Sequence, residues 1–93
     1  MFSSIRDWIE KRRALRRLWQ TDARALVEQD ERNAYYTAQR LAARSRARAD
    51  RASFFHWSKV AAEVSRLSPL TEMNYSVIEA IVAEELSGTS ESE

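Results

Sequence analysis

The stretch ERNAYYTAQRLAARSRARADRASFFHWSKVAAEVSRL, residues 31–67, decides the fold of this chain. Small residues recur in its first part at the spacing of a helix seam, and mostly larger residues recur in its second part. Small side chains that face large ones let two helix axes approach closely, because the large ones fill the remaining space. Asp50, between the two parts, is a good N-cap. The sequence therefore predicts an antiparallel αα-hairpin with helices over about 31–48 and 53–67, and with seams of Ala38, Ala42, Ser45 and Ala49 in the first helix and Phe54, Trp57, Ala61 and Val64 in the second.

An amphipathic helix is predicted before the hairpin. Apolar residues recur over residues 4–20 with a helical period. Beyond them either Thr21 caps a fresh turn or the helix, continuous or kinked, runs to about residue 29, which we favour. Residues 1–19 contain six bases and two acids, and the apolar side carries Phe2, Trp8 and Trp19. Three uses of this helix remain open: it covers the hairpin, it lies on an anionic membrane surface, or it enters the groove of a partner protein.

A shorter acidic helix is predicted after the hairpin. Ser68-Pro69 ends the preceding helix, because proline cannot continue it. A new helix is expected over about 72–86, capped by Thr71 or Asn74 and closed by Gly88. The whole chain is therefore expected to be all-α, with three to four helices in one domain over residues 1–87 and a disordered acidic tail over 88–93.

Charge is divided unequally along the chain. Residues 1–66 contain all 15 bases against 8 acids, a net charge of +7, whereas residues 67–93 contain 6 glutamates and no base. Such a division lets an acidic segment cover a basic surface, or leaves that surface for a partner.

Few residues of this chain suit catalysis. There is no cysteine, His56 is the single histidine, and the single glycine, Gly88, lies near the end. No nucleophile–base pair, phosphate-binding loop or metal-ligand spacing can be assembled from them. No run of apolar residues approaches the roughly 18 that a membrane span needs. We therefore expect a cytoplasmic protein that is not an enzyme and uses no cofactor or metal.

Two segments of the hairpin resemble known proteins. Arg-Ala-Arg-Ala-Asp at 46–50 and His-Trp-Ser-Lys-Val-Ala-Ala-Glu-Val at 56–64 are similar to short uncharacterised helical-hairpin proteins of proteobacteria. In those proteins an Arg/Ala-rich helix, a Gly-Asp turn and an aromatic-x-x-Val-Ala-x-Glu helix recur. This chain has Ala49 where the pattern has glycine. The resemblance implies a bacterial helical protein and attaches no activity to it.

An arginine stripe is predicted on the outer face of the first hairpin helix. Arg40, Arg44 and Arg48 are spaced by four residues, and Arg51 follows them. Such a stripe can track a phosphate backbone, with Tyr36 placed to stack on a base. It can also be a solvated face, or pair within the chain with Glu79, Glu84 or Glu85. These three readings remain open.

Aromatic residues outside the hairpin seam favour association. Phe55 points about 100° away from its neighbour Phe54, and Trp8, Trp19 and Tyr36 also lie off the seam. These four side chains are the candidate protein interface, and we expect a small interaction module that forms a homodimer or binds another protein. A nucleic-acid-associated accessory protein and a peripheral membrane adaptor are the alternatives.

Overall fold

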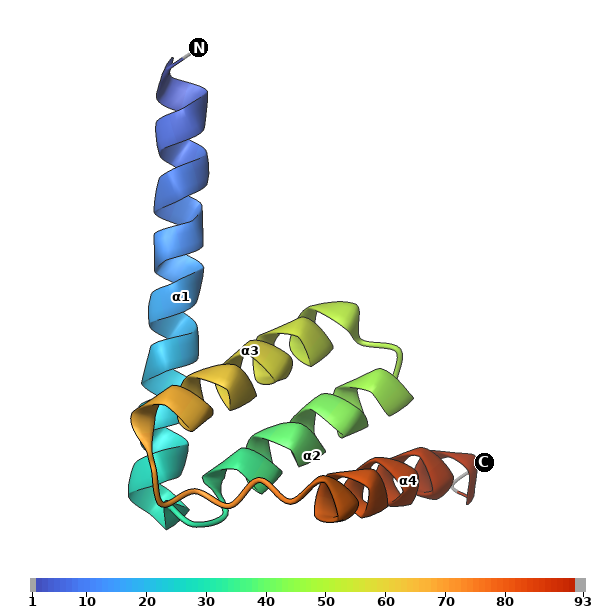
Figure 1. The fold of residues 1–93 in the computed structure, drawn as a ribbon. Helices are drawn as coiled ribbons and strands as arrows, with labels where there is room; N and C mark the ends of the chain where they lie inside the picture. Colours follow the sequence, from blue (N-terminus) through green and yellow to red (C-terminus); the bar gives the residue numbers. More distant parts are fainter. Residues whose placement is uncertain (1, 92–93) are drawn as a thin grey trace.

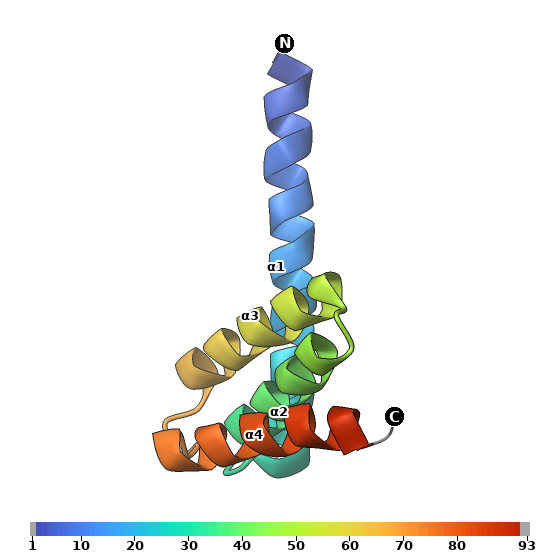
Figure 2. The same ribbon diagram turned by 90° about the vertical axis from the view of Figure 1, so that its right-hand side faces the viewer.

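The computed structural model describes residues 2–91, which form four α-helices. They are α1 (Phe2–Asp30), α2 (Ala34–Ala47), α3 (Arg51–Leu67) and α4 (Tyr75–Glu91). The all-α prediction is confirmed. As Figure 1 shows, α2 and α3 run antiparallel as a hairpin, and α1 lies across one end of it. The turned view in Figure 2 shows α4 on the side of α2 away from α3.

The turn between α2 and α3 is tight because each of its polar groups finds a partner. Asp50 caps α3, as predicted, and its carboxylate accepts a hydrogen bond of 3.1 Å from the Ser53 backbone N–H. The Asp50 N–H donates to the Ser45 carbonyl, and the Ala49 N–H donates to that of Arg46. This pair of bonds is a Schellman motif. Its left-handed position is Ala49, with φ of 59°, where glycine is the residue favoured by sterics.

The core is built mainly from small side chains. Ala23 of α1, Ala34 and Ala38 of α2, and Val60, Ala61 and Val64 of α3 are all at most 1% exposed. The seam prediction for α2 is correct at Ala38, Ala42 and Ser45, which are buried. It is wrong for Ala49, which is exposed in the turn, and for Phe54, which is 40% exposed. The α3 seam prediction is correct at Ala61 and Val64, and the buried face of α3 also includes Val60, because α3 packs against both α1 and α2.

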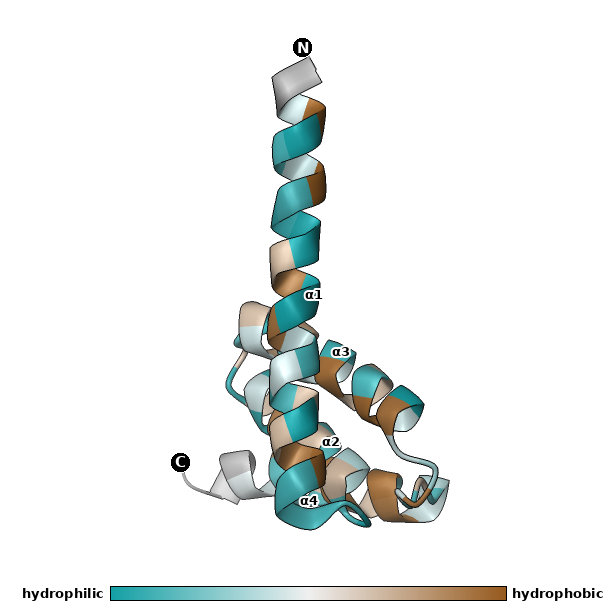
Figure 3. Cartoon of the chain, turned by 90° about the vertical axis from the view of Figure 1, so that its left-hand side faces the viewer, coloured by the Kyte–Doolittle hydropathy of each residue, from teal (hydrophilic) through white to brown (hydrophobic). Residues whose placement is uncertain are grey.

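The helix α1 divides into two halves that differ in what covers them. It is continuous to Asp30, as predicted, since its sequence consists largely of strong helix formers and lacks glycine and proline. Every side chain over residues 4–18, which we call the projecting half, is exposed. In residues 19–30, the packed half, Trp19, Leu26 and Val27 contact the core. Figure 3 shows hydrophobic residues recurring along the projecting half, beyond the rest of the molecule.

The helix α4 joins the rest of the molecule through the linker before it and through α2. Thr71 is buried, and its hydroxyl lies 3.4 Å from both the Arg32 carbonyl and the Tyr35 N–H. Asn74, rather than Thr71, is the capping residue, and its side chain accepts from the Ser76 N–H at 2.9 Å.

The end of α4 differs from the prediction. Gly88 does not close the helix, because its φ is not positive and α4 continues to Glu91. The expected disorder of the acidic tail over 88–93 stays a prediction, and residues 92 and 93 lie outside the described residues.

Candidate functional site

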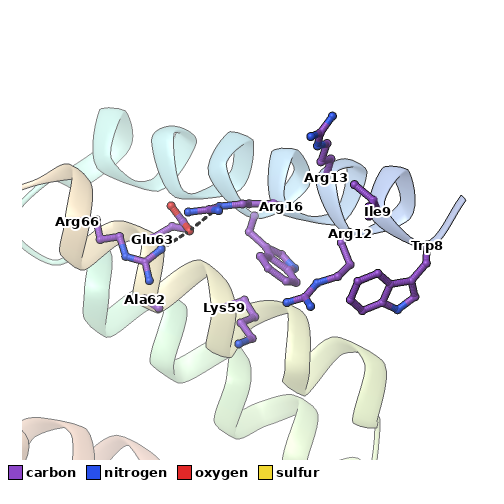
Figure 4. A pocket seen from close by; sticks show the side chains of 10 residues that line it. Trp8, Ile9, Arg12, Arg13, Arg16, Lys59, Ala62, Glu63 and Arg66 are labelled. Atoms are coloured by element: carbon purple, nitrogen blue, oxygen red, sulfur yellow. Dashed lines mark hydrogen bonds and ion pairs between the residues drawn. The ribbon is translucent and has the colours of Figure 1, made fainter. Parts of the chain in front are cut away.

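A groove lies in the corner between the projecting half of α1 and the outer surface of α3. It has a volume of about 470 Å³. From α1 it is lined by Trp8, Ile9, Arg12, Arg13, Arg16 and Trp19, and from α3 by Lys59, Ala62, Glu63 and Arg66. We call it the α1–α3 groove. In Figure 4 the side chains of Trp8 and Arg12 extend from α1 toward the α3 side.

One buried carboxylate connects the two helices at the inner end of the groove. The Glu63 side chain is 7% exposed and accepts a hydrogen bond of 2.8 Å from Arg66 Nη1. Arg16 of α1 places its Nε 4.0 Å from the same carboxylate oxygen, Oε1 (Figure 4). Burying a carboxylate is tolerated only when its charge is compensated, and two guanidinium groups do this here. The only acid of the groove is thus already neutralised by the chain itself.

Two cations of the groove lie against aromatic rings. The Arg12 guanidinium is 5.0 Å from the Trp8 ring centroid. Lys59 Nζ is 5.7 Å from the Trp19 centroid and 5.3 Å from that of Phe55. Trp19 and Phe55 also meet edge to face at 5.7 Å. These cation–π contacts keep positive charge at the groove wall while the outer ring surface stays accessible.

Three of the four candidate interface residues gather at this groove. Trp8 is 58% exposed at its outer end, Trp19 lies within it, and Phe55, 51% exposed, borders it through Trp19 and Lys59. Tyr36 is on the other side of the hairpin, where its hydroxyl accepts a hydrogen bond of 2.8 Å from the Asn74 N–H. The structure therefore separates Tyr36 from the other three.

The arginine stripe of α2 is divided by α4. Arg40 Nη1 donates to Glu85 at 3.0 Å, and Arg44 donates to both Glu85 oxygens at 3.2 and 3.3 Å. Glu84 accepts a weaker bond of 3.4 Å from Arg40. Hydrogen bonds from Arg44 and Arg40 hold the pKa of the Glu85 carboxyl below its ordinary value, and Glu85 raises the pKa of Arg40.

Arg40 and Arg44 thus form ion pairs within the chain, which is one of the three interpretations of the stripe. Glu79 takes no part in it, and Arg48 and Arg51 form no ion pair with another described residue. The four proposed phosphate-binding arginines therefore do not form one free stripe.

The single histidine has a partner that sequence patterns did not indicate. His56 Nε2 lies 2.6 Å from Asp22 Oδ2, and the His56 ring meets that of Trp57 edge to face. Asp22 lies 34 residues away on α1, so no local spacing relates the two. The pair joins α1 to α3 beside the core.

Several groove residues were missed, although a signal for them exists. Arg12 and Arg16 interrupt the apolar arc of α1 at a spacing of four residues. Lys59, Glu63 and Arg66 follow at +4 and +3 on α3 and so share one face. Two charged rows of this kind indicate a common surface only once the crossing of α1 over α3 is known.

Comparison of the chain with protein-family models, curated proteins and solved structures finds no match. Over residues 2–91, no three histidine or acidic side chains come together as a metal site, and no helix has the length and apolar character to cross a membrane. The α1–α3 groove is therefore the candidate functional site on geometry alone.

Proposed function

We propose that this chain is a non-enzymatic helical interaction module that docks a protein partner in the α1–α3 groove. The observation that carries this proposal is that the core-packing face of α1 has apolar side chains again on the projecting half, beyond Arg12 and Arg16. The face of α1 that packs against the core through Trp19, Leu26 and Val27 continues along the projecting half as Ile5, Trp8 and Ile9, each at least 38% exposed. An apolar face with this pattern is normally covered.

The size of the uncovered surface supports the proposal. The chain exposes 6943 Å², whereas a compact monomer of this mass exposes roughly 5,500 Å². Its radius of gyration is 15.2 Å, against about 12 Å for a compact domain of this length. The difference in area, roughly 1,400 Å², exceeds the roughly 800 Å² that one partner buries in a standard protein interface.

Self-association, expected from the sequence, would use the same surface and remains a proposal. A flat membrane fits it less well, because α1 and α3, which cross (Figure 1), both line the groove, and a plane does not enter the corner between them. Nucleic acid binding by the arginine stripe is weakened by the pairing of Arg40 and Arg44 with Glu85.

The proposal is tested by asking whether the groove is open in solution. Small-angle scattering should give a radius of gyration close to 15.2 Å per monomer, and the anionic apolar dye anilinonaphthalene sulfonate should bind. Trp8→Ala should weaken dye binding, whereas Tyr75→Ala, at another exposed aromatic, should not. A compact monomer near 12 Å that binds no dye would mean that α1 folds back and that the docking surface does not exist.

A further inference from the structure

The α1–α3 groove is strongly unbalanced in charge. Its lining contains five bases and one acid, a net charge of +4. The acid, Glu63, is buried and already shared by Arg66 and Arg16. Arg12, Arg13 and Lys59 have no carboxylate partner among the described residues. A partner that buries this groove must therefore bring negative charge of its own, since a buried unpaired cation is costly.

The groove also requires apolar contacts. Trp8, Ile9 and Trp19 line its α1 side, and the exposed Ala62 lines its α3 side. Because alanine is small, another chain can approach the α3 surface closely at this point. Arg12 and Lys59 each lie against an aromatic ring, so their charges border the apolar contact surface.

The shape of the groove favours a helix over a flat surface as its occupant. The projecting half of α1 forms one wall and α3 the other, and the two helices cross at a corner (Figures 1 and 4). A third helix laid along the projecting half of α1 contacts that wall along its length and meets α3 where the two helices cross, as a form of helix-in-groove recognition. The α1 residues that line the groove run from Trp8 to Trp19, which corresponds to about 17 Å of helix, roughly three turns.

We infer that the α1–α3 groove receives an acidic amphipathic α-helix, whose apolar stripe packs on Trp8, Ile9 and Trp19 and whose flanking carboxylates pair with Arg12, Arg13 and Lys59. This inference rests on the proposed docking function and names the chemistry of the partner. A second copy of the chain fits less well through its own groove or projecting half, because each of these surfaces is basic and the projecting half alone carries six bases. Like charges at an interface oppose association.

The test uses the whole chain and two designed helical peptides of about 18 residues. Both carry leucine at the positions of one helix face, and their remaining positions are mostly glutamate in one peptide and lysine in the other. Binding is followed by tryptophan fluorescence and calorimetry. The glutamate peptide should bind with a Kd in the micromolar range, weaken as salt rises, and protect the projecting half from hydrogen exchange. The lysine peptide should not bind.

Matched charge reversals localise the contact. Arg12→Glu with Lys59→Glu changes two groove cations, whereas Arg6→Glu with Arg17→Glu makes the same charge change at exposed residues outside the groove lining. The first pair should weaken binding of the glutamate peptide at least ~10-fold and the second less than ~2-fold. Circular dichroism checks that both variants remain helical. Equal losses in the two variants would mean a non-specific charge effect and would overturn the inference.

The remaining outcomes separate the inference from the proposed function. A dimer in light scattering that Trp8→Ala dissociates, or binding to anionic lipid vesicles that Trp8→Ala abolishes, would replace the acidic helix by a second copy or a membrane. The dimer result would keep the proposed docking function with a different partner. The vesicle result would replace protein docking by membrane binding. If neither peptide, a second copy nor vesicles bind to an open groove, both the inference and the proposed function fail.

Discussion

The two halves of α1 carry the same side-chain pattern in different surroundings. Trp19 and Leu26 of the packed half contact the core, whereas Trp8 and Leu15 of the projecting half are 58% and 45% exposed. Periodicity marks the face that prefers to be covered, and only the tertiary arrangement decides what covers it. An uncovered continuation of a core-forming helix face is therefore a candidate interface.

The largest expected difference in stability is between the tryptophan-to-alanine substitutions in the two halves of α1. Trp19→Ala should lower the free energy of unfolding by about 2–3 kcal/mol, because it removes a partly buried ring from the core and from its contact with Phe55. Trp8→Ala should change it by less than about 0.5 kcal/mol. Urea denaturation measures both values. Equal losses would mean that the projecting half is packed in solution and would remove the contrast.

A smaller effect on stability is expected where Glu85 of α4 pairs with the arginines of α2. Glu85 has a lowered pKa, so its contribution to stability is complete above its ordinary value of 4.5 and is lost as pH falls through its lower folded value. Glu85→Gln should cost about 1 kcal/mol at neutral pH and reduce the loss of stability on acidification. Unfolding measured between neutral pH and pH ~3 tests this. An unchanged pH profile would show that the pairs with Arg40 and Arg44 do not hold α4.

A substitution in the hairpin turn should stabilise the chain without touching the projecting half of α1. Ala49→Gly removes the cost of holding an alanine in the left-handed conformation, about 1–2 kcal/mol. Glycine also raises the conformational entropy of the unfolded chain, which offsets part of this gain. The expected net gain is about 0.5–1 kcal/mol, seen as a higher melting temperature. Ala80→Gly, at an exposed position within α4, is the control and should destabilise by up to ~1 kcal/mol. A loss at both positions would contradict the Schellman turn.

The smallest effect is expected on shortening the projecting half. Deleting residues 2–13 should leave the unfolding free energy of the rest within about 0.5 kcal/mol, because the described side chains among them lie outside the core. Deleting residues 2–25 removes Trp19 and Ala23 as well and should unfold the domain. Calorimetric melting of the two shortened chains distinguishes them.

The features that follow from local patterns were predictable. The continuity of α1, the Asp50 cap and the small-residue face of α2 depend on neighbours within a few residues. The exposed Phe54 and the continuation of α4 past Gly88 were not predicted correctly. At Phe54 the local preference was overruled by the second packing partner of α3, and at Gly88 the preference of glycine for a helix end was not used.

The groove was predictable only in fragments. Trp8, Trp19 and Phe55 were selected for their position off the hairpin seam, and Arg12 and Arg16 were visible as charges within an apolar arc. Their union with Lys59 and Glu63 depends on where α1 crosses α3, which is fixed by the packing of Ala23 in the core. Residue spacing within one helix contains no information on that crossing point. The Asp22–His56 pair escaped prediction for the same reason.

The attachment of α4 has a consequence for the order in which the chain opens. Among the described helices α4 packs against α2 alone, and Ile81, which is 5% exposed, is the one apolar residue that the described side chains of α4 bury. An element held by so few buried contacts forms a separate cooperative unit of low local stability. We therefore expect amide protons of α4 to exchange with solvent through partial openings that leave α2 and α3 protected, so that the chain passes through a native-like three-helix state without global unfolding.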